Sequence, residues 1–532
     1  MNLKARNIVE AKNLTIIYPS NKNPILKNFN FKINKNEHTA IIGESGCGKS
    51  TFAKSIVQML PQNTICKGTL LVDRKDLREI SKHELKIFRR TQIGFIYQDS
   101  IQKLNPLMTV GDHLYELLKI HLPFKSNKYI LKKVRNTFKQ VGIETTRLNS
   151  FPHEFSGGMR QRVCIALAIA LKPNLLIADE PTTSLDTNTS YEIMSQILSL
   201  CNQNDSTLIL ISHDINLAAK WCKKIAIIED GAVVEKGNIK NVLNHPQSFV
   251  GKKLVKSAFK LLAYNHQAYQ YKDPILEVIN LRYWFKLNSS ILRPEWNKAI
   301  NEVSFKLFQN ETLGIVGRSG SGKSTLGKAL VGLLNKRGGQ IKFLNSFSNI
   351  NSSIRINKAK NIQLIFQDPF SSLNPKMKIK DILKEVCLIH KGSKYRDLYE
   401  ERDKILAKLN LPKNNYFLNS YPNQLSGGQL QRISIARALL IQPKILICDE
   451  SVNMLDASVK IEILQLLRKL QIDMNLTIIF ITHDLGLAKR FCSRLLVIHN
   501  GEIIEEGNSK DIFSNPQHQI TKNLLKSSLN IN

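Results

Sequence analysis

Short apolar runs that end in a glycine or an acid recur along this chain, and segments with helix-forming residues lie between them. HTAIIG (38–43), LLIADE (175–180) and LILISHD (208–214) have the length and aliphatic content of buried strands. ETLGIVG (311–317) precedes LGKALVGLL (326–334), whose composition favours a helix. Because strands that alternate with helices usually form a parallel sheet covered by helices, the pattern predicts an α/β fold with a mainly parallel sheet core.

The whole arrangement occurs twice. Lys49 recurs in the second half as Lys323, and Gln98 recurs as Gln367. Three further pairs share one identical spacing, close to that of the first two, namely Ser156 and Ser426, Asp179 and Asp449, and His213 and His483. Because five positions keep both order and spacing, we interpret the chain as a tandem duplication. We expect one domain over 1–250, a partly helical linker over 251–273 and a second domain over 274–532.

Each copy contains one match to G-x-x-x-x-G-K-[ST], placed between an expected strand and an expected helix, as a phosphate-binding loop requires. Glycines let backbone N–H groups turn toward phosphates, and the helix N-terminus adds partial positive charge. Lys49 and Lys323 would neutralise phosphate charge, and Ser50 and Ser324 would bind Mg²⁺. The nucleotide-binding residues expected in the two loops are Gly43, Glu44, Ser45, Gly46, Cys47, Gly48, Lys49, Ser50 and Thr51, and Gly317, Arg318, Ser319, Gly320, Ser321, Gly322, Lys323, Ser324 and Thr325.

Acidic and polar residues stand at the ends of the later apolar runs. Asp179 and Asp449 could hold Mg²⁺ directly or through its water, and the adjacent Glu180 and Glu450 could polarise an attacking water. A strand-end acid or histidine is more often structural than catalytic. Here the repetition favours chemistry, because each histidine follows its aspartate at the same distance in both halves. The remaining candidates, for catalysis or for contact with the metal or water, are His213, His483, Gln98 and Gln367.

Size and composition narrow the class of protein. The 532 residues exceed one ordinary core and suit two domains of roughly 250 residues. A hydrophobic fraction of 42% is typical of globular proteins, and no apolar run approaches the ~18 residues that indicate a membrane span. The first residues have no apolar signal-peptide core, so we expect a soluble chain retained in the cytoplasm. The eight cysteines form no C-x-x-C pair, which disfavours a structural zinc or iron–sulfur site.

The net charge of +33 has two interpretations. It could indicate a nucleic-acid or anionic-membrane partner. It could also reflect lysines spread over solvated faces, which we favour because the basic residues are dispersed and no arginine-rich tail stands out.

Two further segments, FSGGMRQR (155–162) and LSGGQLQR (425–432), precede long helices. With them, the order of motifs in both halves resembles the ABC-type ATPases over essentially the whole chain. The resemblance implies two tandem P-loop NTPase domains, each with a parallel core, an antiparallel β subdomain and a helical subdomain. It also implies two composite sites for ATP and Mg²⁺, each between the loop of one domain and the signature of the other. The signature residues would be Ser156, Gly157, Gly158, Ser426, Gly427, Gly428 and Gln429.

The resemblance suggests two further features of the sites. Tyr18 and Phe285 align as adenine-stacking positions, although Tyr283 and Trp284 adjoin the second. The first signature has Met159 where glutamine is usual, and SVNMLD (451–456) replaces PTTSLD (181–186). Because no catalytic Glu, His or Lys is lost, we expect two hydrolysing sites that can differ in rate.

The segments after the two glutamines, QDSIQKLNP and QDPFSSLNP, resemble the peptide/nickel branch of ABC importers. A fused chain of this length most resembles the ATPase subunits of Yej-type oligopeptide and microcin C importers. Such a subunit lies peripherally on the cytoplasmic face of the cell membrane and binds two membrane permeases, served by a periplasmic binding protein. Segments 99–115 and 368–385 would contact the permeases, although packing within the helical subdomain would also account for them. No direct nucleic-acid partner is expected.

The alternative is a soluble tandem ABC ATPase that acts on the ribosome, where the positive charge would suit RNA. Such proteins typically carry a long charged helical linker and lack the LNP segment, whereas the linker here is short and mixed. A DNA-repair ATPase of the same superfamily would need zinc cysteines and large insertions, which are missing.

Overall fold

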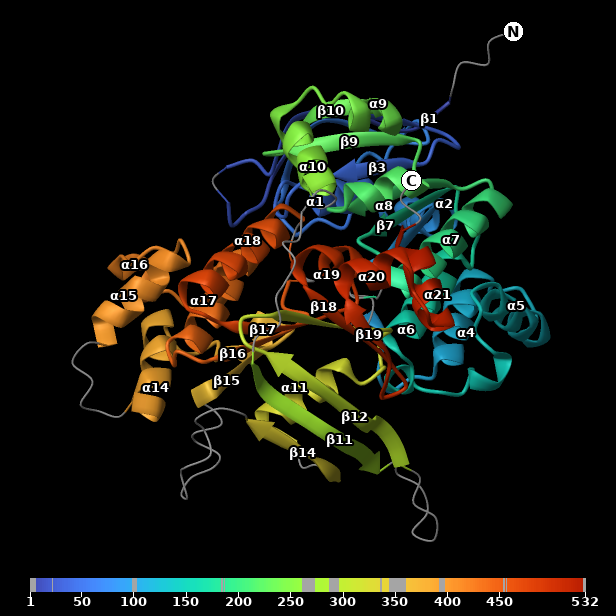
Figure 1. The fold of residues 1–532 in the computed structure, drawn as a ribbon. Coiled ribbons are helices and arrows are strands. Elements are labelled where there is room, and N and C mark those ends of the chain that lie inside the picture. Colours follow the sequence, from blue (N-terminus) through green and yellow to red (C-terminus); the bar gives the residue numbers. More distant parts are fainter. Residues whose placement is uncertain are drawn as a thin grey trace. The chain divides into compact units, whose positions relative to one another are not determined.

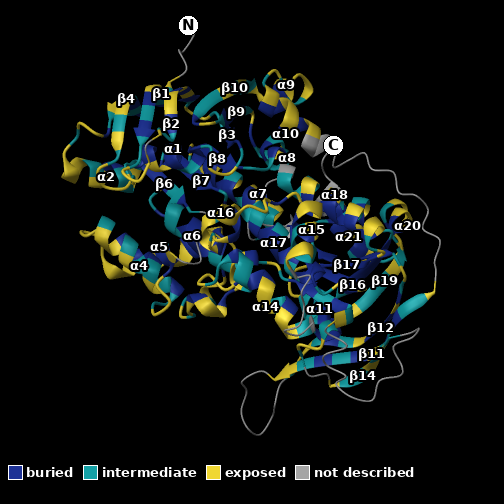
Figure 2. Cartoon of the chain, turned by 90° about the vertical axis from the view of Figure 1, so that its left-hand side faces the viewer, coloured by how far each residue is buried: buried dark blue, intermediate teal, exposed yellow. Residues whose placement is uncertain are grey.

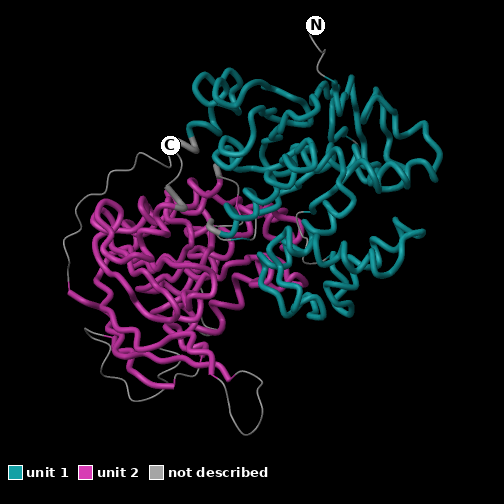
Figure 3. Tube along the Cα trace, turned by 90° about the vertical axis from the view of Figure 1, so that its right-hand side faces the viewer, with its two compact units in different colours: residues 1–185, 189–258, 531 teal, residues 186–188, 259–530, 532 magenta. Residues whose placement is uncertain are grey.

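The computed structural model describes residues 6–21, 23–97, 103–182, 185, 187–260, 273–286, 296–334, 337–343, 360–391, 398–452, 455 and 457–529. The chain divides into two compact units. Unit 1 consists mainly of residues 1–185 and 189–258, and unit 2 mainly of residues 259–530 (Figure 3). Each unit contains one copy of the repeated motifs.

Unit 1 contains strands, α-helices and two short 3₁₀ turns in an alternating order (Figure 1). The strands are β1 (Asn7–Ile17), β2 (Leu26–Asn34), β3 (Thr39–Ile42), β4 (Ile65–Val72), β5 (Lys75–Asp76), β6 (Ile93–Ile96), β7 (Leu175–Asp179), β8 (Thr207–Ser212), β9 (Lys224–Glu229) and β10 (Ala232–Asn238). The helices are α1 (Lys49–Ile56), α2 (Lys82–Gln92), α4 (Val110–His121), α5 (Asn127–Gln140), α6 (Gly157–Ile169), α7 (Thr187–Gln203), α8 (Ile215–Trp221), α9 (Ile239–Asn244) and α10 (Phe249–Lys260).

The described elements of unit 2 follow a similar order. Its strands are β11 (Pro274–Lys286), β12 (Trp296–Phe308), β13 (Thr312–Val316), β14 (Gly338–Phe343), β15 (Ile362–Ile365), β16 (Ile445–Asp449), β17 (Thr477–Thr482), β18 (Arg494–His499) and β19 (Glu502–Asn508). Its helices are α11 (Lys323–Val331), α13 (Pro369–Ser372), α14 (Ile379–Lys391), α15 (Leu398–Lys408), α16 (Asn415–Leu418), α17 (Gly427–Leu439), α18 (Ala457–Asp473), α19 (Leu485–Phe491), α20 (Ser509–Ser514) and α21 (Gln519–Leu529).

The main sheet of each unit is parallel except at one edge. Its strand order is β10-β9-β3-β8-β7-β6 in unit 1 and β15-β16-β17-β13-β18-β19 in unit 2, and the antiparallel pairs are β9–β10 and β18–β19. Strands β7, β8, β16 and β17 are buried at every residue, as expected when both faces of a parallel sheet are covered.

Alternate residues of these strands serve two different cores. In β3, Ile42 packs in the cluster that the helices build, whereas Ile41 packs in the cluster that the antiparallel sheet and α1 build. Successive side chains of a strand point to opposite faces, so one short apolar run stabilises both layers. Figure 2 shows the buried residues concentrated along the strands of the main sheets.

A second, antiparallel sheet completes each unit: β2-β1-β4-β5 in unit 1 and β12-β11-β14 in unit 2. Strand β2 alternates between buried and exposed positions, because only one face of this sheet packs on the core. Helices α4, α5 and α6 pack together in unit 1, as α14, α15 and α17 do in unit 2. The predicted class, a mainly parallel core with an antiparallel β part and a helical part in each half, is confirmed.

Helix α10 overlaps the first part of the segment expected to be the linker. Its residues Leu254 and Val255 are buried in the core of unit 1, and residues 261–272 lie outside the described part of the chain. The boundaries at 250 and 273 therefore stay predictions. Among the helices formed by described residues, none has both the length and the apolar character needed to cross a membrane.

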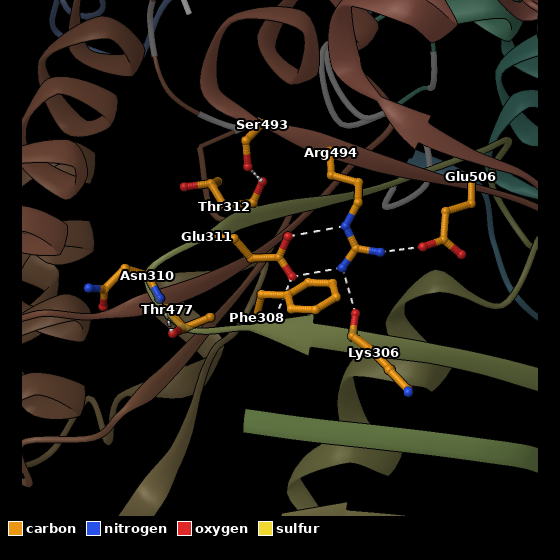
Figure 4. A network of polar contacts seen from close by, with 9 residues as sticks. All are labelled: Lys306, Phe308, Asn310, Glu311, Thr312, Thr477, Ser493, Arg494 and Glu506. Carbon is orange, nitrogen blue, oxygen red and sulfur yellow. Dashed lines mark hydrogen bonds and ion pairs between the residues drawn. The ribbon is translucent and has the colours of Figure 1, made fainter. Parts of the chain in front are cut away.

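Unit 2 contains a buried ion pair between Arg494, at the start of β18, and Glu311, just before β13 (Figure 4). Arg494 Nε and Nη2 donate to the two Glu311 oxygens at 3.1 and 2.7 Å, and Nη2 also donates to the Lys306 carbonyl at 2.5 Å. A further ion pair joins Arg494 to Glu506. The side chains of Arg494 and Glu311 are only 5% and 0% exposed, so this network links β12, β13, β18 and β19 inside the unit.

Candidate functional site

The phosphate loop of each unit connects a central strand to a helix, β3 to α1 in unit 1 and β13 to α11 in unit 2. Gly48 and Gly322 precede these helices with φ of 103°, a left-handed conformation that glycine adopts without strain. A Cβ atom on Gly322 would lie 2.2 Å from the Ala299 carbonyl oxygen. The loop can follow this path only because the sequence has glycine there.

The loop lysines are buried and fold back across their own loops. Lys49 Nζ donates to the carbonyl oxygens of Gly43 and Glu44 at 2.8 and 2.9 Å. Lys323 makes the same two contacts in unit 2, at 2.9 and 2.8 Å, with the corresponding carbonyl oxygens. Each lysine is 4–5% exposed, so its positive charge is concentrated inside the loop that the sequence assigns to phosphate.

The loop serines meet the strand-end aspartates. Ser50 Oγ donates to Asp179 Oδ1 at 3.1 Å, and Ser324 Oγ donates to Asp449 Oδ1 at 2.8 Å. These partners are far apart in the sequence, but the carboxyl ends of parallel strands meet at one edge of the sheet. Burial raises the pKa of both aspartates, although the serine hydroxyls favour the charged forms.

The glutamate after each aspartate has an unusual backbone and a fixed side chain. Glu180 and Glu450 both have φ of 47°, a left-handed conformation that is rare for glutamate and recurs in both units. Their backbone N–H groups donate to the neighbouring strand at Ile211 and Ile481. The side-chain carboxylate of each glutamate contacts the histidine that follows the neighbouring strand.

Both histidines contact these glutamates. Nδ1 of His213 lies 3.2 Å from Glu180 Oε1, and Nδ1 of His483 lies 3.1 Å from Glu450 Oε1. The four side chains are 10–16% exposed, so each pair keeps one open side. In unit 2, Gln367 Nε2 donates to the other oxygen of Glu450 at 2.9 Å.

The structure therefore brings Gln367 to the predicted site. Its counterpart Gln98 lies outside the described residues, together with positions 183, 184 and 186 of the first PTTSLD segment and 453, 454 and 456 of the second.

The two signature segments begin helices α6 and α17 and differ in how the helix start is capped. Ser156 and Ser426 are the N-caps, and each hydroxyl accepts a hydrogen bond from the backbone three residues on. Gln429 returns a bond, because its Oε1 accepts from the Ser426 N–H at 3.0 Å. Met159 stands in its place in unit 1 and has no oxygen to do so. This departure removes the second hydrogen bond of a capping box and leaves the Ser156 cap in place.

The two aromatic candidates are placed differently. Tyr18 follows β1, and its hydroxyl lies 3.1 Å from Thr51 Oγ1 in the first phosphate loop. Phe285 lies on β11 and is 44% exposed, in the strand register opposite Asn297. Tyr283 is buried and donates to the Leu334 carbonyl, so its ring is part of the core. Adenine stacking stays a prediction at both positions.

One loop contact was missed from the sequence. Lys253 Nζ on α10 lies 2.8 Å from Glu44 Oε1. The two residues are 209 positions apart, and no local pattern marks a single lysine on a lysine-rich helix. The available signal was a sequence difference between the two halves. The residues of unit 2 that correspond to Lys253 and Glu44 are Asn523 and Arg318.

Comparison with known proteins places this geometry in a family. The family described as "ABC transporter" matches residues 26–183 and 300–453, once in each unit. The glutathione import ATP-binding protein GsiA of Shigella boydii serotype 4 (strain Sb227) is 34% identical over 561 residues, which cover 98% of this chain and 90% of GsiA. The peptidoglycan transport ATP-binding protein YejF of Agrobacterium fabrum (strain C58) is 34% identical over 512 residues, with 94% and 92% covered.

A solved structure, the dimeric post-hydrolysis state of the ATP-binding cassette MJ0796 bound to ADP and Pi, is 31% identical and covers 43% of this chain and 98% of its own, with a TM-score of 0.40.

The resemblance drawn from the motifs is confirmed by the family match in both halves and by relatives of nearly full length. The chain belongs to the ABC transporter family, in which it is an ATPase with two fused ATP-binding domains.

Proposed function

We propose that this protein is the ATP-hydrolysing subunit of an ABC importer for peptides or peptide-containing solutes. The observation that carries the proposal is the repeated constellation of loop lysine, serine–aspartate pair and glutamate–histidine pair. It occurs in a chain whose relatives of nearly full length are named as import or transport ATP-binding proteins. Glutathione is a peptide and peptidoglycan contains peptides, which supports a peptide-like substrate.

The loop residues bind the triphosphate in this proposal. Lys49 and Lys323 exchange their contacts with loop carbonyls for contacts with phosphate oxygens, because a buried ammonium interacts more strongly with an anion than with a neutral carbonyl. Tyr18 and Phe285 stack on the adenine rings. Glu180 and Glu450 orient the attacking water and accept its proton, while His213 and His483 hold the glutamates in position.

The serine–aspartate pairs are suited to Mg²⁺. Each pair offers a hydroxyl oxygen and a carboxylate oxygen about 3 Å apart, and both are hard ligands of the kind that Mg²⁺ prefers. Burial raises the pKa of Asp179 and Asp449, and a cation beside them would stabilise their ionised forms. The described residues contain no group of three or more His, Cys, Asp or Glu that could hold a metal. Mg²⁺ usually takes only one or two carboxylates and completes its shell with phosphate and water, so this donor set fits. Gln98 and Gln367 are further candidates for the metal or its water.

Two composite sites are part of the proposal. Each unit has one loop and one signature, and each signature presents a serine and two glycines at the start of a 13-residue helix, where N–H groups can bind phosphate oxygens. In one site Lys49, Asp179, Glu180 and His213 would act with Ser426, Gly427, Gly428 and Gln429. In the other Lys323, Asp449, Glu450 and His483 would act with Ser156, Gly157 and Gly158.

The partners proposed are two membrane permeases, and through them a periplasmic binding protein, with this subunit on the cytoplasmic face of the membrane. Apolar side chains in the segments expected to bind the permeases support this, since Leu107 and Phe370 are 85% and 54% exposed. The relatives are named as import or transport ATP-binding proteins, so they do not support action on the ribosome.

The chemistry can be tested with the double variant Glu180→Gln/Glu450→Gln. Glutamine keeps the shape but cannot accept the proton, so ATP hydrolysis should fall by roughly 10²-fold or more while MgATP binding persists. Glu400→Gln, at an exposed glutamate on α15, is the matched control and should keep wild-type turnover. Unchanged hydrolysis in the double variant would refute the assigned roles.

The same variant tests the partners. Trapped with ATP in detergent-solubilised cells of its source organism, it should copurify with two multi-span permeases, identified by mass spectrometry. Copurification of ribosomal proteins and RNA in their place would favour the alternative.

A further inference from the structure

We propose that Lys253 is a positioning residue for the first phosphate loop, and that its ion pair with Glu44 makes the first ATP site depend on helix α10. The residues at the equivalent positions of the second site cannot form this pair. The inference rests on the proposed function of the loops. It means that the position of α10 affects ATP binding at the first site and that no such dependence exists at the second.

Glu44 is the second residue of the first loop and has two roles there. Its carbonyl oxygen accepts from Lys49 Nζ at 2.9 Å, so its backbone helps to hold the loop lysine. Its side chain meets Lys253 Nζ at 2.8 Å, with both side chains about half exposed. A shift of α10 would therefore act on the residue that positions Lys49.

Helix α10 is held firmly enough to transmit such a shift. The Glu235 carboxylate accepts hydrogen bonds from the Gln247 and Ser248 N–H groups at 2.9 and 3.0 Å and from Ser248 Oγ at 2.5 Å. A Cβ atom on Gly251 would lie 2.3 Å from this carboxylate, so the glycine permits its approach. Leu254 anchors the inner face of the helix in the core. Lys253 is thus presented to the loop by a helix fixed at its start and along one side.

Unit 2 holds the corresponding helix in the same way but without the ion pair. The Glu505 carboxylate accepts from the Gln517 and His518 N–H groups at 2.8 and 3.1 Å, and Leu524 is buried like Leu254. The positions that correspond to Lys253 and Glu44 are Asn523 and Arg318, which cannot form an ion pair with each other. The shared anchoring shows that the helices are equivalent, so the charge pair is specific to unit 1.

The difference changes the charge that a nucleotide meets. Glu44 puts a negative charge beside Lys49, and this carboxylate would repel a triphosphate unless Lys253 neutralises it. The corresponding loop residue of unit 2, Arg318, carries a positive charge and needs no compensation. Because α10 presents Lys253 to the loop, any displacement of this helix that draws Lys253 away from Glu44 would weaken ATP binding at the first site alone.

Equilibrium dialysis with radiolabelled MgATP tests this on the full-length chain. The parent carries Glu180→Gln and Glu450→Gln to prevent turnover, and Lys323→Ala to remove binding at the second site. Lys253→Ala should weaken binding at the first site about two- to fivefold, the range expected for a half-exposed pair, and Lys253→Glu should weaken it further. Adding Glu44→Gln to Lys253→Ala should restore the affinity to within about twofold, because the uncompensated charge is gone.

Two controls separate this role from a general structural one. Lys256→Ala, at an exposed lysine on the same helix, should leave binding unchanged. In a parent with Lys49→Ala in place of Lys323→Ala, Lys253→Ala should not affect the second site. Raising the salt to roughly 0.5 M should shrink the Lys253→Ala effect, since exposed charges are screened.

Unchanged first-site affinity in Lys253→Ala would overturn the inference while leaving the proposed function intact. So would equal weakening of both sites, or failure of Glu44→Gln to rescue. Absence of MgATP binding in the parent itself would overturn the proposed function of the loops, and the inference with it.

Discussion

Removal of the Arg494 guanidinium should destabilise unit 2 far more than removal of its counterpart destabilises unit 1. In Arg494→Met the side-chain volume is largely kept, but Glu311 loses both charged hydrogen bonds at a position with 0% exposure (Figure 4). The bond from the Phe308 N–H to that carboxylate, at 2.7 Å, remains but carries no compensating charge. A buried carboxylate without a counterion is among the costliest defects in a protein core.

The expected loss is about 3–5 kcal/mol, the range for breaking a buried ion pair on one side. The chain supplies its own control, because Lys224 and Glu37 occupy the corresponding positions of unit 1 at 3.5 Å with 42% and 28% exposure. Lys224→Met should cost only about 0–1 kcal/mol. For a unit of this size, the Arg494→Met loss corresponds to a fall in melting temperature of roughly 6–20 °C.

Hydrogen exchange with mass spectrometry on the full-length chain can measure this unit by unit. Amides of β13 and β17, in the centre of the unit 2 sheet, should exchange about two to three and a half orders of magnitude faster in Arg494→Met. Amides of β3 and β8 should barely change. Equal effects of Arg494→Met and Lys224→Met, or none from either, would refute the reasoning that burial decides the cost.

The same variant should show a pH dependence of a definite sign. Burial raises the pKa of Glu311 even in the presence of Arg494, which favours the ionised carboxylate. Without Arg494 the pKa of Glu311 should be raised further. A carboxyl whose folded pKa is raised contributes stability below its unfolded pKa and loses it as pH rises through the folded value. The gap in stability between wild type and Arg494→Met should therefore narrow as the pH falls toward the unfolded pKa. A gap that widened on acidification would contradict this account.

Two further predictions concern the sites. Gly322→Ala should abolish MgATP binding at the second loop, as measured by dialysis, because its Cβ would lie 2.2 Å from the Ala299 carbonyl oxygen. The control is Gly320→Ala, whose Cβ would meet no atom within 4 Å. In thermal melts it should cost only about 1 kcal/mol of backbone strain. Asp179→Asn should raise the melting temperature of the nucleotide-free protein at pH 8 but not at pH 4, because burial raises the pKa of Asp179 and only its ionised form is penalised. A lower melting temperature at pH 8 would show that the charged carboxylate stabilises the fold.

Local patterns were sufficient to predict the fold class and much of the site. The residues of a run such as LLIADE are enough to predict a strand that is buried on both faces and has an acid at its end. The glycines of the loops likewise record a backbone path that other residues would obstruct. Side-chain alternation and the steric limits of single residues act locally in the sequence, although the room that the glycines leave is filled by distant residues such as Ala299. Duplication strengthened each of them by presenting it twice.

The partners of charged side chains were decided only by the tertiary structure. Strand β3 lies between β8 and β9, which come much later in the sequence, and β7 lies beside β8. This strand order brings Ser50, after β3, to Asp179, at the end of β7. Glu44 meets Lys253 across 209 residues, and Glu311 meets Arg494 across 183. In a chain with many lysines, the sequence around one lysine does not show which residue it pairs with. Whether its charge stabilises the fold, compensates a loop or only faces water depends on burial and distance, which exist only once the strands are ordered.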